Sequence, residues 1–257
     1  MKAQEIFDLT GEVALVTGAS SGLGARFAQV LAANAAKVAL VARRKDRLDA
    51  VQAQIEAMGG VAISIEADVL DRTAMMRAFD ETQAAFGTVT ILLNNAGVAQ
   101  TARAIDMKEE EWRRVLSIDL DAVFFWAQEG ARRIIASGRK GVIVNTASVL
   151  GFGVSRGVAA YAVAKAGVVQ LTKALALELA AKGVRVNAIA PGWFVTEIND
   201  AFLQSEKGQE IKRSIPLSRF GENGDLDGAL LLLVSRAGAY MTGTSVIVDG
   251  GQTVVLG

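Results

Sequence analysis

The sequence contains no cysteine and no histidine among its 257 residues. The missing cysteines exclude disulfides, thiol nucleophiles and cysteine-based zinc sites. The missing histidines exclude Ser–His–Asp hydrolysis and metal centres built on imidazole ligands. If this protein moves protons, a side chain other than histidine, the most frequent general acid and base in enzymes, must do so.

An excess of charge of one sign and a long apolar run are also missing. The 27 basic residues balance the 27 acidic ones, and without a basic tract we do not expect nucleic acid as a partner. The densest apolar run, ALLLLV at residues 229–234, is too short to span a membrane. The N-terminal MKAQEIFDLTGE is too polar for a signal peptide. We therefore expect a soluble, cytoplasmic protein that has no membrane contact.

Short β-branched segments alternate with longer helical patterns along the whole chain. We expect strands at Val13–Thr17, Lys37–Val41, Ala62–Ala67, Ile91–Asn94, Gly141–Thr146, Arg185–Ile189 and Ser245–Val248. Helical patterns cover Ala25–Ala35, Arg44–Met58, Thr73–Phe86, Glu109–Ser137, Val158–Ala181 and Asp225–Ser235. This alternation predicts an α/β Rossmann fold, a doubly wound parallel sheet of seven strands with helices on both faces. No linker divides residues 1–257, so we expect a single domain, with a substrate lid at about 192–221.

A glycine-rich turn, TGASSGLG, follows the first predicted strand and opens into a helix. Gly18, Gly22 and Gly24 let the backbone approach a pyrophosphate at the positive end of that helix, which predicts dinucleotide binding. The same residues match the G-x-S-x-G pattern of a hydrolase nucleophile at Ser20. That alternative requires a histidine to activate the serine, so it fails.

The end of the second predicted strand indicates which dinucleotide binds. Ala42 takes the position at which an acidic residue would bind the ribose hydroxyls of NAD, and Arg43 and Arg44 follow it. Two guanidinium groups suit a 2′-phosphate, which favours NADP(H) over NAD(H). Alternatively, both arginines only cap the start of a helix. Asp68 could accept a hydrogen bond from the adenine amino group or be an ordinary turn residue.

A serine, a tyrosine and a lysine make up the candidate catalytic group. Ser148 follows the fifth predicted strand, at the carboxyl edge where ligands bind in open α/β sheets. Tyr161 and Lys165 are four residues apart and share one face of the next helix. Free tyrosine, with a pKa of about 10, is a poor acid at neutral pH, but a nearby ammonium favours the phenolate. A lysine-tuned tyrosine can therefore replace histidine as the proton donor, although spacing alone also fits a helix aromatic beside a surface charge.

Together with NNAG at 94–97, PGWFVT at 191–196 and VDGG at 248–251, these motifs resemble the short-chain dehydrogenase/reductase family nearly end to end. The resemblance implies that Tyr161 protonates the substrate oxygen, Lys165 makes Tyr161 more acidic and holds the nicotinamide ribose, and Ser148 polarises the carbonyl. It implies a cofactor site of Gly18, Ser20, Ser21, Gly22, Leu23, Gly24, Arg43, Arg44, Asp68, Val69, Asn95, Ala96, Gly97, Tyr161, Lys165, Pro191, Gly192, Phe194 and Thr196. It also implies a homotetramer.

One residue departs from the family pattern. The phrase SIDLDAV places Asp119 where the family usually has a catalytic asparagine that is thought to hold a water in a proton relay. A carboxylate could still hold that water, but it adds negative charge near Lys165 and could shift the pH optimum. The alternative is that Asp119 is tolerated at this position and has almost no effect on catalysis.

Three functions fit these residues. The first is an NADPH-preferring carbonyl reductase of an apolar small-molecule substrate, because the candidate pocket residues are Leu150, Phe152, Trp193 and Phe202. The segment IPLSRFGE also resembles its counterpart in 3-oxoacyl thioester reductases. The second is a sugar or polyol dehydrogenase, which would want a more polar pocket. The third is a dinucleotide-binding regulatory protein with little turnover.

Overall fold

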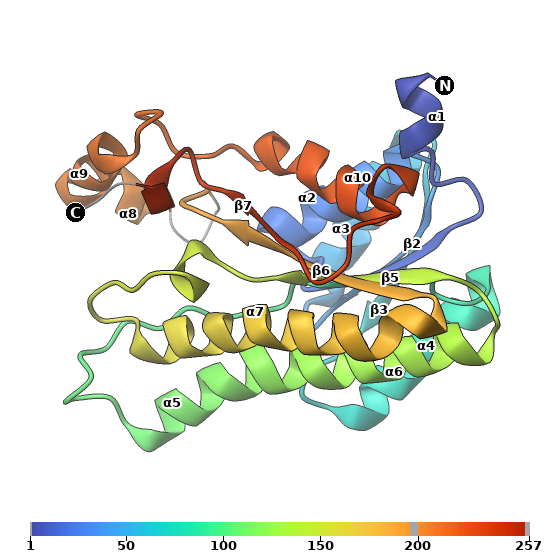
Figure 1. Ribbon diagram of the computed structural model, residues 1–257, viewed down its shortest axis with the longest axis horizontal. Helices are drawn as coiled ribbons and strands as arrows, with labels where there is room; N and C mark the ends of the chain where they lie inside the picture. Colours follow the sequence, from blue (N-terminus) through green and yellow to red (C-terminus); the bar gives the residue numbers. More distant parts are fainter. Residues whose placement is uncertain (1, 196–199, 255–257) are drawn as a thin grey trace.

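A single parallel sheet runs through the protein, with strands in the order β3-β2-β1-β4-β5-β6-β7 (Figure 1). The computed structural model describes residues 2–195 and 200–254. The strands are β1 (Val13–Thr17), β2 (Lys37–Ala42), β3 (Val61–Glu66), β4 (Ile91–Asn94), β5 (Gly141–Thr146), β6 (Val184–Pro191) and β7 (Ser245–Val248). All seven lie within two residues of their predicted positions. The strand order reverses between β1 and β4, which is where an open α/β sheet forms its ligand crevice.

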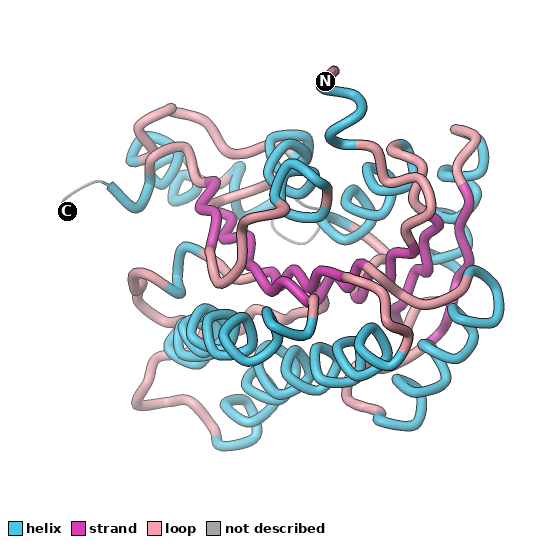
Figure 2. Tube along the Cα trace, turned by 45° about the vertical axis from the view of Figure 1, so that its right-hand side comes forward, coloured by secondary structure: helices cyan, strands magenta, loops and turns pink. Residues whose placement is uncertain are grey.

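Helices cover both faces of this sheet (Figure 2). They are α1 (Ala3–Phe7), α2 (Gly22–Ala33), α3 (Lys45–Ala57), α4 (Arg72–Phe86), α5 (Glu109–Leu116), α6 (Ala122–Ala136), α7 (Ala159–Leu179), α8 (Asp200–Gln204), α9 (Glu206–Ser214) and α10 (Asp227–Val234). The short helices α8 and α9 fall inside the segment predicted as a lid and lie at one end of the molecule in Figure 1. The doubly wound α/β prediction is confirmed.

The long helix predicted for 109–137 is interrupted. A π-helical turn at Ser117–Asp121 separates α5 from α6, and it contains Asp119. Hydrophobic periodicity does not reveal a π turn, because one inserted residue shifts the pattern only slightly. Such turns occur frequently at functional sites.

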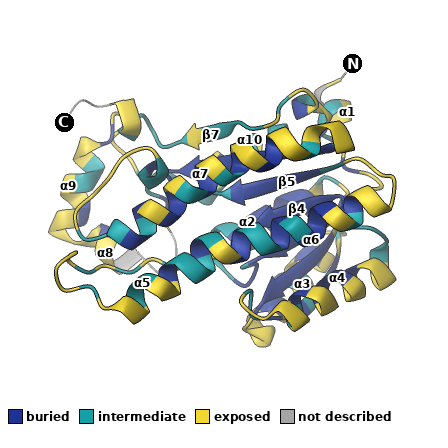
Figure 3. Ribbon diagram, turned by 60° about the horizontal axis from the view of Figure 1, so that its bottom comes forward, coloured by how far each residue is buried: buried dark blue, intermediate teal, exposed yellow. Residues whose placement is uncertain are grey.

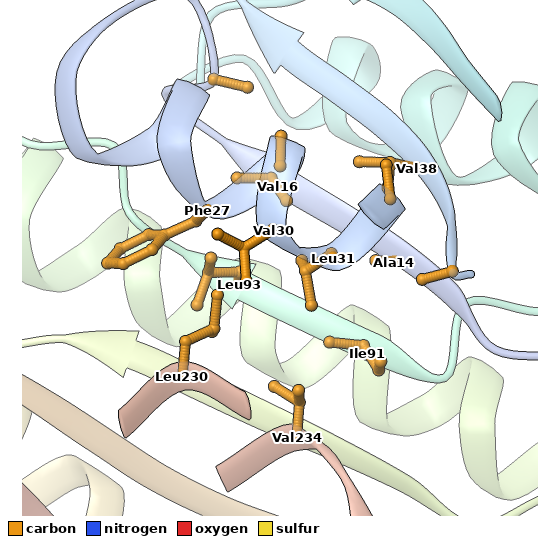
Figure 4. Packing of buried hydrophobic residues seen from close by; sticks show 14 of the residues in the cluster. Ala14, Val16, Phe27, Val30, Leu31, Val38, Ile91, Leu93, Leu230 and Val234 are labelled. Carbon is orange, nitrogen blue, oxygen red and sulfur yellow. The ribbon is translucent and has the colours of Figure 1, made fainter. Parts of the chain in front are cut away.

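The core has two main layers, one on each face of the sheet. On one face, Val16 and Leu93 of the central strands pack against Phe27 of α2 and Leu230 of α10 (Figure 4). On the other face, Phe79 of α4 and Trp126 of α6 cover the sheet. Because both faces are covered, β1 is buried at every position, and Figure 3 shows exposed residues on the outer sides of the helices and on the loops.

A chain of buried polar side chains fixes α7 against the sheet. Asn94 of β4 donates from Nδ2 to Asn145 Oδ1 at 3.0 Å, and Asn145 of β5 donates to Thr172 Oγ1 at 3.0 Å. Thr172 in turn donates to the Val168 carbonyl at 2.8 Å. These bonds hold the helix that bears Tyr161 and Lys165, so they contribute to the geometry of the site.

Candidate active site

The glycine-rich turn and the NNAG segment are built as one unit. The Thr17 hydroxyl accepts hydrogen bonds from the backbone N–H of Asn95 at 3.0 Å and of Ala96 at 3.1 Å. Asn95 Nδ2 donates to the Thr17 carbonyl at 3.2 Å. A Cβ on Gly18 would lie 2.8 Å from the Ala96 Cα, and one on Gly24 would lie 2.3 Å from the Gly18 carbonyl oxygen. Both glycines are therefore required by the packing of these two segments, even before any ligand is considered.

The two arginines after β2 have different partners. Arg44 donates from Nη2 to the hydroxyls of Ser20 at 3.0 Å and Ser21 at 2.9 Å. Arg43 points elsewhere: its Nη1 lies 3.9 Å from Asp68 Oδ2, and its side chain is 67% exposed. Arg44 is the N-cap residue of α3, but its side chain makes no capping hydrogen bond. The alternative that both arginines only cap the start of a helix therefore does not fit the side chain of Arg44.

An open groove of about 700 Å³ adjoins this turn, lined by Ser20, Gly22, Arg26, Arg47 and Asn223 among others. Arg26 forms a bidentate ion pair with Asp227. Asp68, which lies near Arg43, accepts a hydrogen bond from the Leu70 N–H on Oδ1 at 3.0 Å, as a turn residue does, so its contact with an adenine amino group stays a prediction. The neighbouring Val69 carbonyl accepts from Trp126 Nε1 at 3.0 Å.

Ser148 stands just beyond the end of β5. It is 8% exposed and caps a short 3-10 turn at Val149–Gly151. Its Oγ accepts a hydrogen bond from the Leu150 N–H at 3.2 Å, which leaves the hydroxyl proton available to donate. A hydroxyl oriented in this way can polarise a carbonyl at the carboxyl edge of the sheet.

Tyr161 and Lys165 lie on the first turns of α7. The Lys165 Nζ is 5.3 Å from the centroid of the Tyr161 ring and donates to the Thr146 carbonyl at 3.0 Å. Burial alone would lower the pKa of the Lys165 ammonium, but its electrostatic interactions with Tyr161 and Asp119 outweigh that effect and raise this pKa. The lysine is therefore held as a cation beside the tyrosine. The Thr146 carbonyl was not predicted, because a backbone acceptor leaves no signal in the sequence.

Asp119 faces this lysine from the π turn. Its Oδ1 lies 3.1 Å from the Lys165 Nζ, and the two side chains are 0% and 3% exposed. Its Oδ2 accepts a hydrogen bond from the Val98 N–H at 3.0 Å. Burial raises the pKa of the Asp119 carboxyl, while the Lys165 ammonium and the Val98 N–H act against that rise. A Cβ on Gly97 would lie 2.6 Å from Oδ1, so this glycine leaves room for the ion pair.

The segment after β6 contains several of the residues predicted to bind the cofactor. Gly192 donates to the Val248 carbonyl at 3.0 Å, and a Cβ there would lie 2.8 Å from the Asp249 Cβ. The Phe194 side chain is 5% exposed and belongs to the core. Thr196 lies outside the described residues.

Two of the aromatic residues predicted to form the substrate pocket contact each other. The rings of Trp193 and Phe202 have centroids 5.9 Å apart. Phe202 is 41% exposed and Phe152 is 47% exposed, whereas Leu150 is half-buried. Exposed aromatic rings offer apolar contact area to a ligand.

Comparisons with known proteins agree with this geometry. A family model described as "Enoyl-(Acyl carrier protein) reductase" matches residues 18–253. The 3-oxoacyl-acyl-carrier-protein reductase FabG of Staphylococcus aureus is 38% identical over 240 residues, which cover 93% of this chain and 97% of that protein. Gluconate 5-dehydrogenase of Gluconobacter oxydans is 36% identical over 257 residues and the full length of both chains.

Solved structures show the same fold. A short-chain type dehydrogenase/reductase from Mycobacterium marinum superposes with a TM-score of 0.94 at 36% identity, over 99% of this chain and 100% of that one. A gluconate 5-dehydrogenase from Burkholderia cenocepacia, solved with NADP and tartrate, gives a TM-score of 0.94 at 32% identity, over 99% and 100% of the two chains. The chain belongs to the short-chain dehydrogenase/reductase family. It is an NAD(P)-dependent oxidoreductase that acts on CH–OH or C=O groups.

Proposed function

We propose that this protein is an NADPH-preferring carbonyl reductase of apolar ketones, in which Tyr161 is the general acid. The observation that supports the chemistry best is the group formed by Ser148, Tyr161 and Lys165. The serine has a free hydroxyl proton, and the tyrosine has a fixed ammonium 5.3 Å from its ring centroid. These are the parts that a ketone reduction needs from a protein, namely a polarising donor and a proton source.

The chain also fits the nicotinamide dinucleotide that this reaction requires. Gly22 opens α2, whose first backbone N–H groups favour a pyrophosphate, and Gly18 has a positive φ of 69° that suits a tight turn. The cofactor supplies the hydride when bound. The protein residues orient the ketone: Ser148 donates to its oxygen, and Tyr161 gives that oxygen a proton as negative charge develops on it. Lys165 stabilises the phenolate that remains.

Preference for NADPH is supported by Arg44. Its guanidinium lies against the glycine-loop serines, on the side where the adenosine ribose of a dinucleotide binds in this fold. The acidic residue that would bind the ribose hydroxyls of NAD is replaced by Ala42, which is 8% exposed. A planar cation in this position suits a phosphate.

A sugar or polyol dehydrogenase is the second candidate. Gluconate 5-dehydrogenases match the chain over its full length, so the comparisons support this class as well as the reductases. We favour an apolar substrate because of the aromatic pair Trp193 and Phe202. We also propose that the segment predicted as a lid, of which residues 192–195 and 200–221 are described and 196–199 lie outside the described residues, covers the substrate. Location in the cytoplasm and assembly as a homotetramer stay predictions. The third candidate is a regulatory protein with little turnover, and the presence of Ser148, Tyr161 and Lys165 argues against it.

The test is initial-rate oxidation of NADPH, and separately NADH, with a panel of ketones. The panel contains a 3-oxoacyl thioester, an aryl ketone, a diketone and a keto-sugar acid. We expect turnover with NADPH and one of the apolar ketones. If only the keto-sugar acid is turned over, the protein is instead a sugar dehydrogenase, the second candidate.

A further inference from the structure

The buried ion pair of Asp119 and Lys165 is the part of the site in which this chain departs from its family. The aspartate is fully buried, and its two oxygens have different partners. The Lys165 ammonium is 3.1 Å from Oδ1, and the Val98 N–H donates to Oδ2 at 3.0 Å. Burial raises the pKa of the Asp119 carboxyl, and both partners act against that rise in favour of the ionised carboxylate. The geometry is that of a cation and an anion in contact, whose charges largely cancel at a distance.

Lys165 acts on Tyr161 through its charge, so anything that offsets this charge also acts on Tyr161. The ammonium lies 5.3 Å from the Tyr161 ring centroid and favours the phenolate. The Asp119 carboxylate, on the other side of the ammonium, favours the neutral phenol. Because Lys165 and Asp119 are shielded from water, salt screens these effects only weakly.

The surroundings of the pair add no further opposing charge within the described residues. The ionisable groups that shift the pKa of Lys165 are Tyr161 and Asp119, and the one that shifts the pKa of Asp119 is Lys165. The end of β5 contributes the neutral Thr146 carbonyl, and the segment after β4 contributes the neutral Val98 N–H. Asp121, on the same π turn as Asp119, is exposed.

We propose that Asp119 is a positioning residue that sets the acidity of Tyr161 through Lys165, so that Tyr161 keeps its proton to a higher pH than it would beside an uncompensated lysine. The inference rests on the proposed role of Tyr161 as general acid. Asp119 would therefore favour carbonyl reduction over alcohol oxidation near neutral pH. A protonated tyrosine can give its proton to a carbonyl oxygen, whereas alcohol oxidation requires the phenolate and is therefore confined to more alkaline pH.

The chain allows a direct test, because it contains only two tyrosines. Tyr240 is fully exposed, so a Tyr240→Phe background leaves the tyrosinate absorbance to report Tyr161 alone. We expect Asp119→Asn to lower the pH midpoint of this absorbance change by about one unit, the order expected for removing one charge several ångströms away in a poorly screened site. Asp121→Asn removes the same charge from an exposed position of the same turn. This matched control should leave the midpoint unchanged.

An unchanged or raised midpoint in folded Asp119→Asn would overturn the proposal. If that variant does not fold, Asp119→Ser offers a smaller neutral side chain and must give the same lowering. Failure of both to fold, while Asp121→Asn folds, would make Asp119 a structural residue and overturn the proposal as well. The titration needs neither substrate nor turnover, so a failure of the proposed function on the ketone panel is distinguishable from a failure here.

Discussion

Arg44 donates to the hydroxyls of both Ser20 and Ser21 and so connects the end of β2 to the glycine-rich turn. Its neighbour Arg43 is 67% exposed and approaches only Asp68. The two arginines are adjacent in sequence, but only Arg44 is held against the glycine-rich turn. If the protein prefers NADPH as proposed, this difference points to Arg44 as the residue that contacts the 2′-phosphate.

We therefore expect Arg44→Gln to raise the KM for NADPH about tenfold, the order of one lost charge-assisted hydrogen bond. The KM for NADH should change little, since NADH has no 2′-phosphate. Arg43→Gln removes an equal charge one residue away and is the matched control, for which we expect a smaller effect. Steady-state kinetics with both cofactors checks this, and a larger effect of Arg43→Gln would reverse the assignment.

The close approach of the two cofactor-binding segments predicts the effect of a single methyl group. Gly24→Ala would place a Cβ 2.3 Å from the Gly18 carbonyl and 2.5 Å from Asn95 Nδ2. We expect loss of NADPH binding by at least about tenfold, because the turn must shift away from the pyrophosphate position. Gly228→Ala on α10 is the control: nothing lies within 4 Å of the added Cβ. It should bind NADPH normally and unfold at the same or a higher temperature.

The buried polar chain beneath α7 predicts a loss of stability. Thr172→Val keeps the volume of a fully buried side chain but leaves the Asn145 Nδ2 without its acceptor. We expect the free energy of unfolding to fall by about 1–3 kcal/mol, the cost of an unsatisfied buried donor. The same substitution at the exposed Thr73 should change stability by less than about 0.5 kcal/mol. Denaturant unfolding of the two variants measures the difference, and equal losses would contradict this account.

The aromatic pair in the candidate pocket separates the two substrate classes. Phe202→Ala removes one ring of a contact with centroids 5.9 Å apart. If apolar ketones bind there, their KM should rise about tenfold, the order expected for one lost aromatic contact. The KM for NADPH should stay the same. If Phe202→Ala instead raises the KM for the keto-sugar acid and leaves the KM for the apolar ketones unchanged, the result would favour a sugar dehydrogenase.

The sheet and its order of elements could be predicted because a parallel sheet covered on both faces leaves strong periodic signals. Most of the strands are short apolar runs, and the longer helical patterns between them carry apolar faces. The glycine-rich turn and the pair Tyr161 and Lys165 could be predicted because their spacing along the chain is visible in the sequence. Spacing and periodicity do not determine the direction in which a side chain points after a strand or helix ends.

The points that the sequence did not settle are of that kind. Nothing in the dipeptide Arg43–Arg44 shows which guanidinium reaches the serines, and the burial of the Phe194 ring depends on its contact with Gly221, far along the chain. The pairing of Asp119 with Lys165 requires a π turn, which periodicity does not reveal. The negative charge near Lys165 was predicted, but its contact distance was not.

The most direct test of the central claim is the Tyr161→Phe variant, measured for turnover and for NADPH affinity in the same preparation. The substitution removes one hydroxyl and keeps the ring beside Lys165. We expect kcat to fall by at least about a hundredfold, the contribution of a positioned general acid, while the Kd for NADPH stays unchanged. Turnover that persists near the wild-type rate would contradict the assignment of Tyr161 as the proton donor.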